Sequence, residues 1–255
     1  MKPYLLSRTN WQTVRDLSPE LALLPWGATE AHNLHLPYTT DVIETEKIAA
    51  ESARKAWEKK CRVLVLPAVP FGVNTGQLDI RGTININPST QFAILKDIAG
   101  DLYRQGIYKL LIVNGHGGND FKQMIRETGA LFPEMFICTC NWFQAVDGKD
   151  YFERGGGHAD EMETSLMLYL APELVLPMSE AGKGKAKKFR IEGLNEKWAW
   201  AERKWTEVTA DTGIGDPSLA TKEKGEKYFN AVTDKLCELI VGISEADIRD
   251  LYVQA

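Results

Sequence analysis

LALLPWGATEAHNLHLPYTTD, residues 21–41, starts as a strand and ends where a helix begins. The apolar run over residues 21–24 is typical of a buried strand, which the following proline ends. Glu30 and His32 are two residues apart, so their side chains project from the same side if this segment stays extended. Asp41 then opens the next helix. The stretch therefore predicts two carboxylates and an imidazole that converge just beyond a strand end.

Two carboxylates and an imidazole form a typical ligand set for a divalent transition metal. Each residue also has an ordinary structural interpretation. Glu30 could be a solvated loop acid, and His32 or His35 a hydrogen-bonded structural histidine. Asp41 could be a helix N-cap, with Glu44 completing a capping box. The histidine count favours the metal, because the chain has four histidines and the other two lie in the unusual segments VNGHGGN and HADEMETS.

The composition is that of a soluble globular protein. The chain has 255 residues, of which 44% are hydrophobic and 25% charged, so it can bury a sizeable core. A net charge of −5 without a basic stripe excludes a nucleic-acid partner. The sequence has neither a signal peptide nor an apolar run that could span a bilayer, and its four cysteines include no CxxC pair. We therefore expect a single domain over residues 1–255, cytoplasmic, without a membrane partner.

Strands alternate with helices along most of the chain. Apolar runs predict further strands at 62–69, 108–113 and 135–140. Helical periodicity and end signals predict helices at about 41–60, 88–106, 120–131, 159–170, 221–241 and 244–252. This alternation favours an α/β fold with a mostly parallel sheet covered on both faces. Ligands of such sheets bind beyond the carboxyl ends of the strands, which is where residues 24–41 and 114–119 lie.

Two further segments could border the site. Residues 70–87 form a long loop rich in glycine and asparagine, and a loop of this length in a compact domain is usually functional or a lid. Trp198, Trp200 and Trp205 lie within eight residues. We favour an aromatic patch in the core or at a subunit contact, because aromatic residues are enriched at interfaces. The alternative is a pocket wall that stacks on a planar substrate.

The segment HADEMETS, residues 158–165, offers further ligands. If His158 starts a helix, Glu161 lies ~60° away around the axis, on the same face. Glu163 lies about 160° from Glu161 and is expected to brace the helix or a neighbouring loop. The structural alternative for Glu161 is a first-turn acid that complements the helix dipole. The glycines around His116 let the backbone approach an ion or a substrate closely, or else form a plain glycine turn.

These motifs resemble those of the creatininase (creatinine amidohydrolase) family. Its motifs are similar to EAHNLHLPYTTD, NGHGGN and HADEMETS, and its Gly-Asp-Pro…Ala-Thr…Lys-Gly segment is similar to GIGDPSLATKEKG at 213–225. The four motifs occur in the same order and span residues 25–225. The resemblance implies a three-layer α/β/α sandwich with a mostly parallel sheet, a homohexamer, and two divalent metal ions in each subunit.

The resemblance also implies a set of metal ligands, with the aspartate bridging both ions: Glu30, His32, Asp41 and His116. Creatininase proper has an acid two residues after the loop histidine, where this chain has Gly118, and it lacks an acid at the position of Glu161. We predict that Glu161 supplies the missing ligand and acts in catalysis. The segment TGQLDIRGT lacks the histidine often found there, and Asp160 replaces a glycine. These departures leave the identity of the substrate open.

The charges of the predicted ligands match two ions. Glu30, Asp41 and Glu161 contribute −3 against +4 from two divalent ions, and one bridging hydroxide balances the remainder. A metal-bound water can lose its proton near pH ~7, and paired ions lie roughly 3.5–4 Å apart. Our hypothesis is that this hydroxide attacks an amide carbonyl. His158 would then protonate the departing nitrogen as a general acid, and His35 would support a ligand or the fold.

The expected activity is therefore hydrolysis of an amide, lactam or formamide C–N bond in a small nitrogen compound. Mixed nitrogen and oxygen ligands suit Zn²⁺, our first choice, and also Mn²⁺ and Fe²⁺. A peptide-cleaving member of the same family is the second interpretation. A metal-binding scaffold without catalysis is the third, although a structural metal site is closed and needs no acid.

Overall fold

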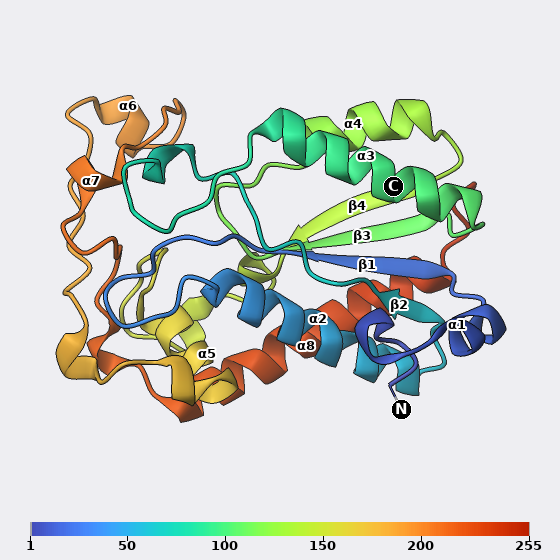
Figure 1. Cartoon of the computed structure of the whole chain (residues 1–255), viewed down its shortest axis with the longest axis horizontal. Coiled ribbons are helices and arrows are strands. Elements are labelled where there is room, and N and C mark those ends of the chain that lie inside the picture. The colour runs from blue at the N-terminus through green and yellow to red at the C-terminus, as the bar shows by residue number, and fades with distance from the viewer. Residues whose placement is uncertain (1, 255) are drawn as a thin grey trace.

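Four parallel strands form the centre of the fold in the order β2-β1-β3-β4, in a computed structural model that describes residues 2–254 (Figure 1). They are β1 (Leu21–Trp26), β2 (Val63–Val65), β3 (Lys109–Asn114) and β4 (Phe136–Asn141). Every residue of β1 is buried, because both faces of this central strand are covered. Its alternate residues therefore contribute to two separate apolar clusters. Leu21 and Leu23 lie in one, and Ala22, Leu24 and Trp26 in the other.

Helices cover both faces of the sheet, which confirms the three-layer α/β/α sandwich. On one face lie α3 (Pro88–Arg104) and α4 (Lys122–Leu131), and on the other lie α2 (Thr40–Glu58) and α8 (Lys222–Glu245), as Figure 1 shows. The helix α5 (Glu161–Leu170) packs against α8. Short helices complete the fold: α1 (Trp11–Leu17), α6 (Glu192–Asn195) and α7 (Trp205–Val208). Among residues 2–254, no helix has the length and apolar character needed to cross a bilayer.

The predicted elements form with two notable differences. The strand predicted at 62–69 is confined to Val63–Val65, because the prolines that follow cannot donate to the ladder. The separate helix predicted at 244–252 does not form, so that prediction was wrong. Instead α8 continues to Glu245, Ala246 turns to extended backbone, and the Asp247 carboxylate accepts a hydrogen bond from the backbone N–H of Arg249. That side chain stabilises a turn in place of a helix.

The sheet register places two loops side by side. The last residue of β1, Trp26, pairs with the last residue of β3, Asn114, and the N–H of Gly115 donates to the carbonyl of Trp26 at 2.9 Å. The segments 27–41 and 115–121 therefore leave the sheet at the same edge. This brings residues that are far apart in sequence to one end of the molecule.

Candidate metal centre

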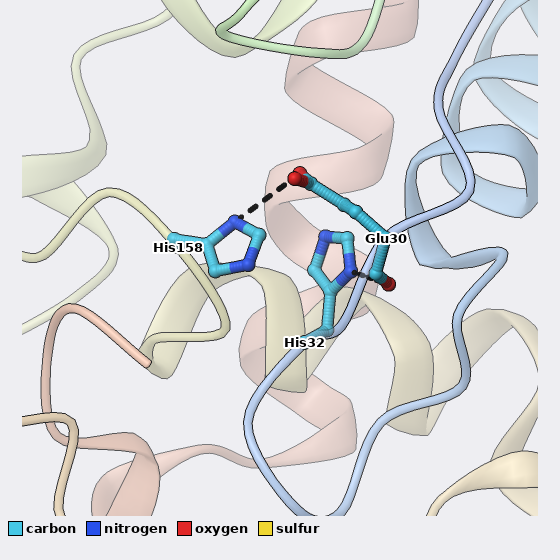
Figure 2. Close-up of side chains that lie close together, drawn as sticks. All are labelled: Glu30, His32 and His158. Carbon is cyan, nitrogen blue, oxygen red and sulfur yellow. Dashed lines mark hydrogen bonds and ion pairs between the residues drawn. The ribbon is translucent and has the colours of Figure 1, made fainter. Parts of the chain in front are cut away.

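Three histidines and three carboxylates meet beyond the carboxyl ends of β1 and β3, and all six are buried. They are Glu30, His32, Asp41, His116, His158 and Glu163. They come from three segments, which are the loop after β1 with the start of α2, the loop after β3, and the chain at the start of α5. The side chains fall into overlapping sets of three whose ligand atoms lie within 4.8 Å of one another. One of these sets, Glu30, His32 and His158, is drawn in Figure 2.

Asp41 lies at the centre of this cluster. Its Oδ1 is 2.9 Å from Nε2 of His32, and its Oδ2 is 3.0 Å from Nδ1 of His116. The imidazoles of these two motifs, 84 positions apart in the chain, thus contact the same carboxylate. Each oxygen of Asp41 faces a different imidazole, which is the arrangement that a ligand shared by two ions requires.

Glu30 also divides its two oxygens. Its Oε1 lies 3.0 Å from Nδ1 of His116 and 3.6 Å from Nδ1 of His158, the second contact being visible in Figure 2. Its Oε2 accepts a hydrogen bond from the side-chain amide of Gln77. Gln77 is buried in the loop 70–87, so this loop reaches the cluster through a residue that no local sequence signal marks.

The three histidines share a hydrogen-bond pattern that exposes one ring nitrogen to the carboxylates. The other nitrogen of each ring donates to a backbone carbonyl, which can only accept: His32 Nδ1 to Glu30 at 3.1 Å, His116 Nε2 to Val73 at 3.0 Å and His158 Nε2 to Ala31 at 2.8 Å. In a neutral ring the remaining nitrogen carries a lone pair, and here it faces a carboxylate oxygen. Two such acceptors repel each other unless a proton or a cation lies between them. This is how metal-binding histidines are held in proteins.

The charges of the cluster keep protons on two of its imidazoles. Burial by itself lowers the pKa of His32, but the carboxylates of Asp41 and Glu163 raise it to about 10. Against the same effect of burial, Glu30 and Asp41 hold the pKa of His116 well above its ordinary value. Burial would raise the pKa of Asp41, yet His32 and His116 hold it below its usual range. Divalent cations and protons compete for such nitrogens, so the donor set fits a metal.

The structure does not bring Glu161 together with the other predicted ligands. Its Oε1 is 2.5 Å from Nζ of Lys224, and its Oε2 accepts hydrogen bonds from the backbone N–H groups of Glu153 and Arg154 at 3.1 and 2.8 Å. The helix begins at Glu161, so His158 precedes it and the predicted angle between the two side chains does not apply. Glu161 thus has the bracing position that was predicted for Glu163.

Glu163 lies in the cluster instead. Its Oε2 is 4.0 Å from Nε2 of His32, and the same oxygen accepts a hydrogen bond from the backbone N–H of Ala159. Asp160 is the N-cap, with its side chain accepting from the N–H groups of Met162 and Glu163. The spacing Asp160-x-x-Glu163 is that of a capping box, although Glu163 accepts from the N–H of Ala159, one residue before the N-cap. This signal in the sequence could have identified Glu163.

The backbone geometry explains the absence of a side chain at Gly118. A Cβ atom added there would lie 2.3 Å from the carbonyl oxygen of Val73 and 2.5 Å from Nε2 of His116. The hydrogen bond that orients His116 therefore occupies the space where creatininase proper carries an acid. An acid from α5, Glu163, approaches the cluster from another direction.

His35 lies beside the cluster and contacts α5. It is buried, and its Nε2 lies 2.9 Å from the hydroxyl oxygen of Thr164. Burial, together with the positive charge of His32, lowers the pKa of His35 to about 4. A neutral imidazole that bonds a helix hydroxyl suits a role in holding the loop 31–36 against α5.

A cavity of about 1370 Å³ opens onto the cluster. Its wall includes Trp200 and Trp205, and the Trp205 ring packs edge-on against His158 with centroids 4.7 Å apart. Trp198 and Trp200 are 78% and 81% exposed, so neither lies in the core of the chain, and the predicted subunit contact stays a prediction. The pocket-wall alternative describes Trp200 and Trp205, which both line the cavity.

Comparisons with known proteins place these features in context. The model of the creatininase family, described as creatinine amidohydrolase, matches residues 7–240. A mycofactocin precursor peptide peptidase of Mycobacterium tuberculosis (strain H37Rv) is 28% identical over 232 residues, which cover 85% of this chain and 82% of the relative. The family match extends over both loops and the helix that form the cluster.

Solved structures share the same fold. A Bacteroides fragilis NCTC 9343 protein, provisionally assigned as a creatinine amidohydrolase, superposes with a TM-score of 0.92 at 45% identity, covering 97% of this chain and 99% of the other. A creatininase variant described as Zn–Zn type superposes with a TM-score of 0.77 at 21% identity, covering 93% and 96%. At that identity the second match shows the fold alone.

Proposed function

The chain belongs to the creatininase family, and we propose that it is a two-metal amidohydrolase that cleaves a C–N bond of a small nitrogen compound. One observation carries this proposal. Asp41 presents its two oxygens to two imidazoles, and each imidazole is oriented by a backbone carbonyl so that its free nitrogen faces a carboxylate. Such an arrangement provides two adjacent ligand sets that share one aspartate.

The ligands divide between two positions. Glu30 and His116 would hold one ion and His32 and Glu163 the other, and Asp41, whose two oxygens face His32 and His116, would serve both. The three carboxylates contribute −3 against +4 from two divalent ions, so the net charge is +1. Replacing Glu161 by Glu163 in the ligand set does not change this sum. When bound, such ions would lower the pKa of a water and polarise a carbonyl. Zn²⁺ is our first choice because of the mixed nitrogen and oxygen ligands, with Mn²⁺ and Fe²⁺ as alternatives.

His158 is our candidate general acid. Its Nε2 donates to the carbonyl of Ala31, and this bond fixes the ring so that Nδ1 points toward Glu30 (Figure 2). A proton on Nδ1 can therefore be delivered to a nitrogen that leaves beside Glu30. The edge of Trp205 restricts the ring from the cavity side. The residue thus has an orientation that suits proton transfer at the open side of the cluster.

The size of the cavity supports a second candidate function, the cleavage of peptides. Pockets for small molecules commonly have volumes of roughly 300–1,000 Å³, whereas this cavity has about 1370 Å³. The Mycobacterium tuberculosis relative is named a peptidase. A scaffold without catalysis is disfavoured, because a closed structural site would not open onto a cavity of this size.

Metal analysis combined with an amide panel tests the proposal. We expect two ions per chain by elemental analysis and turnover of at least one lactam, formamide or dipeptide by the reconstituted protein. His158→Ala should keep both ions and lose roughly 10²–10⁴-fold in rate. Loss of metal from that variant would make His158 a ligand, and one ion or none in the folded wild type would favour the scaffold. Native mass spectrometry tests the homohexamer that family resemblance favours.

A further inference from the structure

Arg203 lines the cavity close to the metal-binding cluster. Its guanidinium carbon lies 5.3 Å from the centroid of the Trp205 ring, and this ring contacts His158 at 4.7 Å between centroids. Arg203 thus lies over the Trp205 ring, which in turn packs edge-on against the candidate acid along one wall. A cation held over an indole face is stabilised and oriented by the ring.

The charged neighbours of Arg203 all have partners. The carboxylate of Glu202 accepts hydrogen bonds from Thr75 Oγ1 at 2.8 Å and from the backbone N–H of Arg203 at 3.2 Å. Lys204 forms ion pairs with Asp79 at 3.5 Å and with Glu207 at 3.2 Å. Within residues 2–254, by contrast, no carboxylate forms an ion pair with the guanidinium of Arg203. The charge of Arg203 is therefore available to a molecule in the cavity.

The backbone that carries Arg203 is held in place by the loop 70–87. A Cβ atom added at Gly76 would lie 2.3 Å from the carbonyl oxygen of Arg203 and 2.8 Å from Cδ1 of Trp205. The two segments therefore pack backbone to backbone, and the hydroxyl of Thr75 ties them together at Glu202. Because the wall is braced on the loop that also supplies Gln77, its position relative to the cluster is defined.

We propose that Arg203 and Trp205 bind a carboxylate on the substrate, so that the substrate is an amide bearing a free carboxylate near the bond that is cleaved. This inference rests on the proposed function. The planar guanidinium binds a carboxylate through two parallel hydrogen bonds, which is stronger and more specific than a lysine contact. Compounds of this class are N-acyl amino acids and peptides with a free C-terminus. Water adds to the acyl carbon, the C–N bond breaks, and the amine that leaves takes a proton and retains the carboxylate.

Kinetics on matched substrates test this assignment. An N-acyl amino acid that the enzyme cleaves is compared with its carboxamide, in wild type, Arg203→Ala, Arg203→Lys and the neighbouring control Lys204→Ala. We expect the wild type to prefer the acid by at least 10-fold in kcat/KM, mainly through KM. The preference should fall to near one in Arg203→Ala, fall partly in Arg203→Lys, and persist in Lys204→Ala. An equal preference in wild type and Arg203→Ala would overturn the proposal.

A binding measurement separates this proposal from the proposed function. Metal-free protein is titrated calorimetrically with the same N-acyl amino acid and with its carboxamide, so that no turnover is needed. The acid should bind at least 10-fold more tightly than the carboxamide, and Arg203→Ala should abolish the difference. This result without turnover of any amide would keep the carboxylate site and reject the hydrolase. Equal binding of both ligands by the wild type would reject the carboxylate site.

Discussion

The first turn of α5 holds two buried glutamates with opposite surroundings. Glu161 faces Lys224 of α8, and it also accepts hydrogen bonds from the backbone N–H groups of Glu153 and Arg154. Glu163, two residues later, faces the cluster, where the N–H of Ala159 is the donor that it contacts and His32 is its nearest ring. A helix turns by about 100° per residue, so two positions suffice to send the side chains in nearly opposite directions.

The difference shows how a buried carboxylate reveals its role. A carboxylate that receives a cation and two N–H donors from the protein has its charge compensated, so it stabilises the fold. A carboxylate that faces a ring nitrogen of an imidazole is compensated only by an exchangeable proton, and a cation can replace that proton. Burial alone does not distinguish the two, because both glutamates are buried. Their donors do.

Removing the charge of Glu163 should have the largest effect on metal content and activity. Glu163→Gln keeps an oxygen for the N–H of Ala159 but removes the negative charge beside His32. We expect the loss of one ion per chain and a fall in activity of more than about 100-fold, since changes outside the ligand set already cost 10–100-fold. Elemental analysis and kinetics measure both effects.

Glu161→Gln is the matched control for that variant, because it makes the same substitution two residues earlier. It should retain two ions and most of the activity while lowering the stability of the fold. If the two variants exchanged these outcomes, with metal lost from Glu161→Gln, the original prediction of Glu161 as a ligand would be restored.

Gln77 provides an intermediate case, since it donates to one oxygen of Glu30 while the other oxygen faces imidazoles. Gln77→Leu should free that oxygen, loosen the orientation of Glu30 and weaken metal affinity by about 10–100-fold. Competition with a chelator measures the affinity without reference to activity. Unchanged affinity in a variant with a native circular dichroism spectrum would show that the amide does not orient Glu30.

Removing the cation beside Glu161 should affect stability and leave the metal in place. Lys224→Met leaves Glu161 with two backbone donors only. Breaking a fully buried pair costs ~3–5 kcal/mol, and because the Lys224 side chain is 24% exposed we expect about 2 kcal/mol. Urea unfolding measures the change. A loss of metal without a loss of stability would contradict the structural role of this pair.

The smallest effect is expected from His35, which contacts Thr164 on the same helical turn. Burial lowers the pKa of His35 from 6.5 to about 4 in the folded state. Between these values the unfolded chain binds more protons, so His35 makes stability fall as pH decreases from 6.5 toward 4. In metal-free protein, His35→Gln should reduce that slope by at most about 1.4 kcal/mol per pH unit. Urea unfolding at pH 7 and pH 5 tests this prediction. An equal loss of stability between these pH values in the wild type and in His35→Gln would contradict it.

Much of the candidate site could be predicted from the sequence, because its ligand types lie in short motifs at strand ends. Glu30, His32, Asp41 and His116 were predicted to converge, and the structure brings them together. The choice between two glutamates could not be made from helical angles, because the angle is useful only when the first helical residue is known. The first helical residue is set by Asp160, which caps α5 and is a local signal in the sequence.

The sequence by itself determined the alternation of strands and helices, the parallel sheet and most of the residues at its functional edge. The elements follow from apolar periodicity and local end signals, which act over a few residues, and the residues at this edge from short motifs that resemble those of the creatininase family. Only the tertiary structure decided that Lys224 compensates Glu161, that Gln77 reaches Glu30, and that Arg203 and Trp205 border the cluster. Each of these contacts joins segments at least 45 positions apart, where the partner depends on how the layers pack and on nothing in the local sequence.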